Sequence, residues 1–354
     1  MFRALDPDFA GVAFERRDAP FLHGLGSVPK SGEEFVDVQL CHHVSCSART
    51  GSYRTEAGNR HRGTSLREML DRRLLLVSGK GGVGKSAVSA ALAIVAARKG
   101  KRVLALAMVG PNGLAAHLGV ASLSYEPTRI RPGLFGVSVD RSHALDEYLG
   151  LQIHLARSLP TRQLSNALSV LADTAPGIRE IVTIGKPIFE VWRGEWDLVI
   201  ADAPPLGQLQ SYLSAPQTIT GLVPTGAVRE QASRLESTLS DPAVSSLLLV
   251  TTPEELAVQE TREAIAEIDT GRQILIGGVI ANRVLEPLGV AADAIAAIPE
   301  GPARAAGLLH TGLAESQAVW LESIPRDTRL PFLFGFHTPG EVAARLADIL
   351  EGFM

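Results

Sequence analysis

A glycine-rich segment that lies between an apolar run and a helix-forming stretch constrains this chain more than any other feature. The run Leu74–Val77 is wholly apolar, as expected of a strand buried on both faces of a parallel sheet, and the stretch after the glycines predicts a helix from about Ser86 to Arg98. The segment between them reads Gly79-Lys80-Gly81-Gly82-Val83-Gly84-Lys85-Ser86. Glycines in this context let successive backbone N–H groups surround phosphate oxygens, and the start of the helix adds a favourable dipole. The sequence therefore predicts a loop that binds the phosphates of a nucleotide, with Lys85 between the β- and γ-phosphates and Ser86 as a Mg²⁺ ligand.

Apolar runs recur along the rest of the chain and are separated by stretches of helical character. The further predicted strands are Arg102–Met108, Leu134–Val139, Leu198–Ala201, Leu247–Val250 and Ile274–Ala281. Alternating strands and helices favour an α/β fold with a doubly wound, mostly parallel sheet that helices cover on both faces.

Two segments have the pattern of a helix start. Thr252-Pro253-Glu254-Glu255 and Thr338-Pro339-Gly340-Glu341 each place a Glu three residues after a Thr, which predicts a capping box with Pro at the first helical position. The first predicts a helix that runs to about Thr270. The second predicts a last helix with an apolar face formed by Val342, Leu346, Ile349, Leu350 and Phe353.

The chain divides by pattern into a leader and a nucleotide-binding domain. Residues 1–70 show no sustained periodicity and are interpreted as a disordered leader, whereas residues 71–354 form the predicted domain. Within that domain, a stretch at about 142–192 predicts a helical insert with a break near Ala175-Pro176-Gly177. Such an insert could carry the surface that contacts a specific partner.

The leader contains the only two cysteines of the chain. They lie in the group Cys41, His42, His43 and Cys46. Cys and His are good Zn²⁺ ligands, but no second ligand pair follows, so a metal site and a chance cluster both remain open. Because Met69 lies just before the first predicted strand, a further interpretation is that the functional chain begins there.

Composition narrows the class of partner. The chain has 354 residues, and 34 basic against 38 acidic residues give a net charge of −4, while aromatic residues make up 5%. This balance disfavours a nucleic-acid partner. No apolar run reaches the roughly 18 residues that a membrane span needs. The N-terminus also lacks a secretory signal pattern, so we expect a cytoplasmic protein without an integral membrane segment.

An acidic residue follows the predicted strand Leu198–Ala201 and is the second candidate element of the nucleotide site. Asp202 ends this strand, where its carboxylate can hold Mg²⁺ directly or through water. The next segment, Ala203-Pro204-Pro205-Leu206-Gly207-Gln208, can sense a γ-phosphate through a backbone N–H and change shape on hydrolysis.

Together these segments resemble the ArsA-type family of anion-transporting and tail-anchored-protein-targeting ATPases. The sequence as a whole resembles the actinobacterial branch of this family, whose members appear as paired, unequal subunits. The resemblance runs from about Leu74 to the C-terminus. It depends on the glycine-rich loop, Asp202–Gly207, Ala175–Glu180, Val250–Leu256 and Ala281-Asn282-Arg283-Val284.

The resemblance implies ATP and Mg²⁺ as ligands and a dimer as the active unit. Lys80 marks the deviant Walker A class, in which this lysine reaches the nucleotide of the partner subunit. The family also implies that Asn282 binds adenine, since a carboxamide can act as donor and acceptor together. Pro331 in the Leu330-Pro331 region would complete that pocket. An unidentified client protein is a further implied partner.

Three features depart from the family pattern. Val109 stands where the family usually has an Asp that positions the attacking water, and Val109 cannot accept a hydrogen bond. No cysteine follows Cys46, which disfavours arsenite binding and a zinc-bridged dimer. The predicted insert holds no Met, which disfavours a tail-anchored client, because promiscuous apolar grooves often use Met.

The sequence leaves three functional hypotheses. The first is a dimeric switch that binds and hydrolyses ATP, with Lys80, Lys85 and Asp202 as its catalytic groups. The second, motivated by Val109, is a nucleotide-binding subunit of a heteromeric ATPase that hydrolyses slowly or not at all. The third is a membrane-surface positioning ATPase, which the acidic end of the last helix disfavours.

Overall fold

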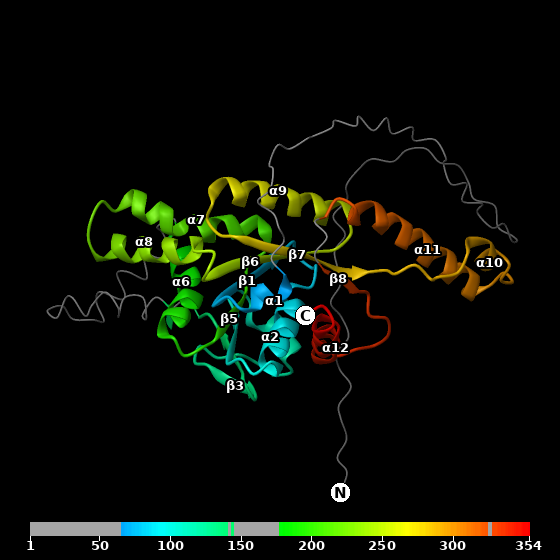
Figure 1. Cartoon of the computed structure of the whole chain (residues 1–354), viewed down its shortest axis with the longest axis horizontal. Helices are drawn as coiled ribbons and strands as arrows, with labels where there is room; N and C mark the ends of the chain where they lie inside the picture. The colour runs from blue at the N-terminus through cyan, green and yellow to red at the C-terminus, as the bar shows by residue number, and fades with distance from the viewer. Residues whose placement is uncertain (1–64, 141–142, 145–176, 325–327) are drawn as a thin grey trace, which may run out of the picture. The chain divides into compact units, whose positions relative to one another are not determined.

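A computed structural model describes residues 65–140, 143–144, 177–324 and 328–354 of the chain (Figure 1). All of them belong to one compact unit, which extends from Asn59 to Met354. The cluster Cys41, His42, His43 and Cys46 lies outside the described residues, as does most of the predicted insert.

The described unit is built on one eight-stranded sheet with the order β3-β4-β2-β5-β1-β6-β7-β8. Every neighbouring pair is parallel except β3 and β4, which are antiparallel. The strands are β1 Leu74–Gly79, β2 Val103–Ala107, β3 Thr128–Arg131, β4 Leu134–Ser138, β5 Leu198–Asp202, β6 Ser245–Thr251, β7 Ile276–Val284 and β8 Thr328–Pro331. The predicted doubly wound, mostly parallel α/β fold is confirmed.

Helices cover both faces of this sheet. Strand β1 divides its side chains between two cores, with Leu74 and Leu76 in one and Leu75 and Val77 in the other, because successive residues of a strand point to opposite faces. Figure 1 shows α2 and α12 together, and both contribute to the second core. The described helices are α1 Leu66–Leu70, α2 Lys85–Arg98, α3 Pro111–Leu118, α6 Ile178–Arg193, α7 Leu206–Leu222, α8 Ala227–Ser240, α9 Glu255–Gly271, α10 Ala292–Ala296, α11 Pro302–Leu321 and α12 Pro339–Glu351.

The helix boundaries agree with the sequence patterns in two places. Helix α2 starts with the loop lysine and ends at Lys99-Gly100, where Gly100 has φ +85°, a conformation that favours glycine. The capping box at Thr338 is present, with Thr338 and Glu341 each accepting a hydrogen bond from the other's backbone N–H. The apolar face of α12 packs as predicted except at Phe353, which lies beyond the helix and is exposed.

The capping box predicted at Thr252 was wrong. Strand β6 continues to Thr251, and Thr252 is still buried against the sheet. The chain then turns through Pro253, where the N–H of Glu254 donates to the carbonyl of Thr252. Helix α9 therefore begins only at Glu255, and no side chain caps its first turn.

Helix α6 covers the last part of the range expected to form a helical insert. Its N-cap is Gly177, with φ +87°, and its residues Ile181, Ile184 and Ile188 are buried in the core under the sheet. This part of the range is therefore a layer of the main fold. Residues 145–176 lie outside the described residues.

The fold begins before the expected boundary at residue 71. Helix α1 has a full capping box, in which Ser65 and Glu68 exchange hydrogen bonds. Leu66, Met69 and Leu70 are buried in the same core as α2. Residues that the sequence pattern assigned to the leader thus belong to the packed domain.

Replacing Leu66 by alanine is expected to lower the free energy of unfolding by about 2–3 kcal/mol, because it removes a buried side chain and leaves a cavity. Urea denaturation of the full chain measures this change. Arg67→Ala is the matched control, since Arg67 lies on the same helix and is exposed. Equal unfolding free energies for the two variants would show that α1 does not contribute to the core.

Candidate functional site

The glycine-rich loop joins the carboxyl end of β1 to α2 in a conformation that needs its glycines. A Cβ on Gly79 would lie 2.0 Å from the carbonyl oxygen of Val250 in β6, so no other residue fits there. Gly82 and Gly84 have φ values of +87° and +95°, which L side chains rarely adopt. The loop shape predicted from the sequence is therefore present.

The side chain of Lys85 turns back over this loop. Its Nζ donates a hydrogen bond to the carbonyl oxygen of Lys80 at 3.0 Å. Burial lowers the pKa of the Lys85 ammonium, and the nearby Asp202 carboxylate acts in the opposite direction. An ammonium held inside the loop on a single carbonyl can exchange that partner for phosphate oxygens.

Asp202 and Ser86 meet beside the loop. Strands β1 and β5 are paired with Val77 opposite Asp202, so the end of β5 reaches the start of α2. The Ser86 hydroxyl donates to Oδ2 of Asp202 at 2.5 Å, and Ser89 lies 3.5 Å from Oδ1. Burial raises the pKa of the Asp202 carboxyl, while the hydrogen bond from Ser86 and the charge of Lys85 lower it.

The Ser86–Asp202 pair fits a Mg²⁺ ion by the chemistry of its donors. A hydroxyl and a carboxylate are both hard oxygen ligands, and Mg²⁺ in phosphate sites takes one or two such protein ligands besides phosphates and water. The carboxylate is buried and held by hydroxyl groups, so a cation here would offset its desolvation.

Asn282 contacts the same loop from β7. Its Nδ2 donates to the carbonyl oxygen of Val83 at 2.8 Å, and a Cβ on Gly84 would lie 2.4 Å from that nitrogen. Pro331 ends the neighbouring strand β8, where it is paired with Val284. The structure thus brings Asn282 to the loop and places Pro331 at the same edge of the sheet.

Lys80 makes an ion pair within its own chain. Its Nζ lies 2.6 Å from Oε1 of Glu260 in α9, and both side chains are partly exposed. Sequence reasoning missed Glu260, because a single Glu on a polar helix face carries no signal of its own.

The segment after β2 approaches Ser86. The side chain of Val109 is apolar, and the residue is 41% exposed. Gly113 of α3 approaches Ser86 so closely that a Cβ on Gly113 would lie 3.0 Å from the Ser86 hydroxyl oxygen. His117, one turn further, bonds through Nδ1 to the Gly113 carbonyl at 2.7 Å, which is a second group that sequence reasoning missed.

The segment after β5 is anchored to β1. The hydroxyl of Ser78 donates to the carbonyl oxygen of Pro204 at 2.6 Å. Helix α7 begins at Leu206 with Pro205 as its N-cap, so Gly207 lies in its first turn. Within the described part of the chain, no group of three or more His, Cys, Asp or Glu side chains could hold a metal ion. None of the helices described is long and apolar enough to cross a membrane.

Comparison with known proteins gives a consistent result. The sequence pattern of the anion-transporting ATPase family matches residues 72–225 and 224–289, which include the loop, Asp202 and Asn282. The ATPase BagA of Mycobacterium tuberculosis is 32% identical over 277 residues, which cover 73% of this chain and 81% of that protein. The arsenical pump-driving ATPase of Acidiphilium multivorum is 28% identical over 284 residues, which cover 72% of this chain and 46% of that protein. The chain belongs to the anion-transporting ATPase family.

Proposed function

We propose that this chain is a Mg²⁺-dependent ATP-binding and ATP-hydrolysing switch that works as a dimer. The observation that carries the proposal is the convergence of Lys85, Ser86 and Asp202 on one glycine-rich loop. Mg²⁺ would supply charge neutralisation between the β- and γ-phosphates when the nucleotide is bound. Ser86 and Asp202 would hold the ion, and Lys85 would leave the Lys80 carbonyl to contact phosphate.

The base of the nucleotide would lie near the ends of β7 and β8. Asn282 supports this, because its amide group is fixed against the loop by the Val83 carbonyl. Pro331, on the adjacent strand, would form part of the apolar wall. Release of the γ-phosphate would be sensed by the segment after β5, which Ser78 ties to the strand that carries the loop.

A second function is favoured by Val109. Its side chain cannot orient a water molecule, so the chain could be a nucleotide-binding subunit that turns over slowly until a paired homologous subunit or another group supplies this function. Measurement of ATP binding by calorimetry and of phosphate release by the purified chain separates the two functions. Tight binding with phosphate release that disappears in Lys85→Ala supports the first. Tight binding without release supports the second, and absence of binding contradicts both.

The third functional hypothesis, a membrane-surface positioning ATPase, has no support in the last helix. The apolar residues Ala343, Leu346, Ala347 and Leu350 of α12 are buried in the core. This helix therefore presents no free apolar face to a lipid surface.

Replacing Lys80 by alanine is expected to leave ATP affinity within about threefold of wild type and to reduce turnover by about 10²-fold or more. The reason is that a cation which reaches a partner's nucleotide stabilises charge only in the closed dimer. Calorimetry and phosphate-release assays measure the two effects. Lys99→Ala, which removes an exposed lysine at the other end of α2, is the control. Unchanged turnover in Lys80→Ala would show that Lys80 only pairs with Glu260.

A further inference from the structure

Gln208 is an exposed residue in the first turn of α7, and its side-chain amide is free to bind another molecule. Helix α7 begins at Leu206, and both Gln208 and the preceding Gly207 are exposed. The backbone N–H of Gln208 donates to the carbonyl of Pro205 at 2.8 Å. Its side chain makes no hydrogen bond with any residue that the structure describes. The amide can therefore donate to one group and accept from another at the same time.

The backbone that carries Gln208 is fixed beside the glycine-rich loop. The hydroxyl of Ser78, the residue before the first loop glycine, donates to the carbonyl of Pro204 at 2.6 Å. Leu206 and Leu209, which flank the exposed pair at the start of α7, are buried in the core. Gln208 is thus held at a defined place at the carboxyl edge of the sheet, where parallel sheets bind their ligands.

The order of the strands places Gln208 between the loop and Val109. Strand β5 lies between β2 and β1 and is parallel to both. Val109 follows β2, the glycine-rich loop follows β1, and Gln208 is on the segment that follows β5. The N–H of Met108 donates to the carbonyl of Asp202 at 3.1 Å, so the segments of Val109 and Gln208 begin side by side. Gln208 is therefore on the segment adjacent to the one where Val109 offers no polar side chain.

The same strand order gives the direction of a nucleotide bound to the loop. In the proposed function the base lies near the ends of β7 and β8, the phosphates bind the loop after β1, and Asp202 at the end of β5 helps to hold the ion between the last two phosphates. The phosphate chain then runs from the β7 side of the loop towards the β5 side. The γ-phosphate and the water that attacks it would lie on the β5 side, next to the segment of Gln208.

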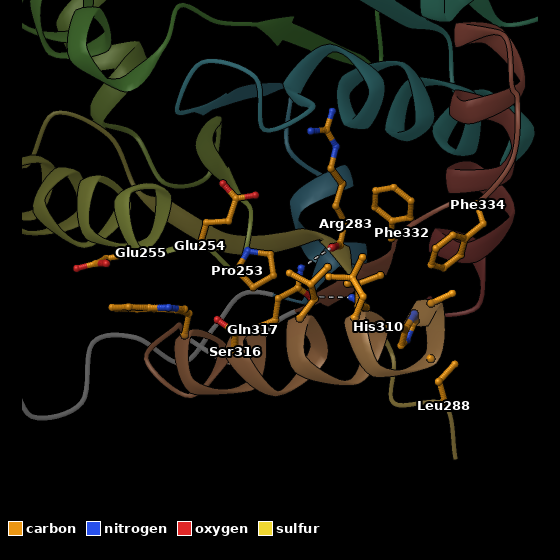
Figure 2. A pocket seen from close by; sticks show the side chains of 16 residues that line it. Pro253, Glu254, Glu255, Arg283, Leu288, His310, Ser316, Gln317, Phe332 and Phe334 are labelled. Atoms are coloured by element: carbon orange, nitrogen blue, oxygen red, sulfur yellow. Dashed lines mark hydrogen bonds between the residues drawn. The ribbon is translucent and has the colours of Figure 1, made fainter. Parts of the chain in front are cut away.

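The polar side chains on the other side of the loop are at the wrong end of such a nucleotide. Glu254, Glu255, His310 and Gln317 line a cavity of about 960 Å³ beside the ends of β6, β7 and β8 (Figure 2). This is the end of the sheet where the base is expected. His310 and Gln317 are also already bonded to backbone groups.

Three further polar side chains on the β5 side fit the task less well. Gln210 is two residues from Gln208, so the two do not face the same way on the helix, and Oε1 of Gln210 is buried. The ring of His117 is bonded to the carbonyl of Gly113. Asn112 is exposed, but it adjoins Gly113, which approaches the hydroxyl proposed to bind the ion. Asn112 is the remaining alternative.

We infer that Gln208 orients the water molecule that attacks the γ-phosphate and replaces the acceptor that is missing at Val109. This inference rests on the ATP hydrolysis of the proposed function and names a catalytic residue for it. Oε1 of Gln208 accepts a hydrogen bond from the water, and Nε2 donates to a γ-phosphate oxygen. A Gln orients the attacking water in the same way in P-loop GTPases.

The amide orients the reactants and takes no proton itself. The water oxygen forms a bond to the γ-phosphorus, and the bond from that phosphorus to the bridging oxygen breaks. The electron pair of the broken bond stays with ADP, and a proton of the water passes to the released phosphate. Positioning of this kind affects the rate of the chemical step and not the affinity for ATP.

Replacing Gln208 by leucine should therefore lower kcat for phosphate release by about 10²-fold or more and leave the dissociation constant for ATP with Mg²⁺ within about threefold of wild type. Phosphate-release assays and calorimetry on the full chain measure the two effects, and circular dichroism checks the fold. Gln217→Leu is the matched control, because Gln217 is exposed on the same helix, and it should change neither value. Asn112→Leu should also leave kcat within about threefold of wild type. A loss of turnover in Asn112→Leu with none in Gln208→Leu would overturn the inference.

Val109→Asp supplies an acceptor on the adjacent segment and should make Gln208 dispensable. The double variant Val109→Asp/Gln208→Leu should release phosphate at least about tenfold faster than Gln208→Leu and at a rate within about threefold of Val109→Asp. A structural defect in Gln208→Leu would not be repaired by a carboxylate on another segment. If Val109→Asp binds ATP as wild type does but the double variant stays as slow as Gln208→Leu, Gln208 does not act by orienting water and the inference is wrong.

The outcomes for wild type separate this inference from the function on which it rests. Phosphate release that is the same in Gln208→Leu and wild type would overturn the inference and leave the proposed hydrolysis standing. Wild-type protein that binds ATP but releases no phosphate would also overturn it, because the chain would then lack a working group to orient the water. Absence of ATP binding by wild type would refute the proposed function itself.

Discussion

Replacing Lys85 by alanine is expected to weaken binding of ATP with Mg²⁺ by at least about 10²-fold. The side chain is the cation that the structure places inside the loop, and charge-assisted bonds to phosphate oxygens are the strongest interactions available there. Calorimetry at fixed ionic strength measures the change.

The stability of the unliganded protein should not fall in Lys85→Ala. Burial lowers the pKa of this ammonium, which means that the charged side chain destabilises the folded protein when no ligand is bound. A thermal denaturation midpoint at or above the wild-type value is therefore expected. ATP affinity that stays at the wild-type level would refute the assignment of the loop, whereas a lowered midpoint would mean that misfolding explains the loss of binding.

Replacing Asp202 by asparagine is expected to have opposite effects on activity and stability. Loss of the carboxylate removes a proposed Mg²⁺ ligand, so phosphate release should fall by about 10²-fold or more. Burial raises the pKa of Asp202 in the folded protein, so the folded state binds a proton more tightly than the unfolded state. The contribution of this group to stability is therefore present at low pH and is lost as the pH rises through the folded pKa. At neutral pH the unliganded Asp202→Asn variant should melt at a higher temperature than wild type.

Thermal melts from pH 4 to pH 8 and phosphate-release assays test both effects. Ser86→Ala is the matched control, because it removes the other proposed ligand and leaves the buried carboxylate in place. It should weaken the Mg²⁺ dependence of ATP affinity without raising the melting temperature. A melting temperature of Asp202→Asn that falls at neutral pH would show that the hydrogen bond from Ser86 and the charge of Lys85 stabilise the carboxylate by more than burial costs.

The central strands were predictable because each contains an uninterrupted apolar run. Strands β1, β5 and β6 are buried at every residue, and their runs Leu74–Val77, Leu198–Ala201 and Leu247–Val250 stand out in the sequence. The edge strands β3 and β8 were not predicted. Both have four residues, and β3 has no buried residue, so neither interrupts the surrounding polar pattern.

The candidate site likewise contains residues that the sequence predicted and residues that it did not. The loop, Ser86 and Asp202 are set by short segments whose spacing is fixed by a strand and a turn, and the structure brings these residues together. Glu260 lies 180 residues beyond Lys80, and only the packing of α9 beside the loop makes them neighbours. The capping box at Thr252 was also predicted wrongly because of tertiary packing. Burial of Thr252 at the end of β6 overrode its local preference to cap a helix. Local patterns carry no information on such long-range contacts.

The contacts that fix the loop have a consequence for the thermodynamics of ligand capture. Val250 confines Gly79, the Asn282 amide donates to the Val83 carbonyl, and Lys85 donates to the Lys80 carbonyl, so contacts within the chain fix the shape of the loop. The conformational entropy of ordering the loop is therefore lost when the chain folds and not when a ligand binds. A phosphate group would bind to backbone N–H groups that are already in position.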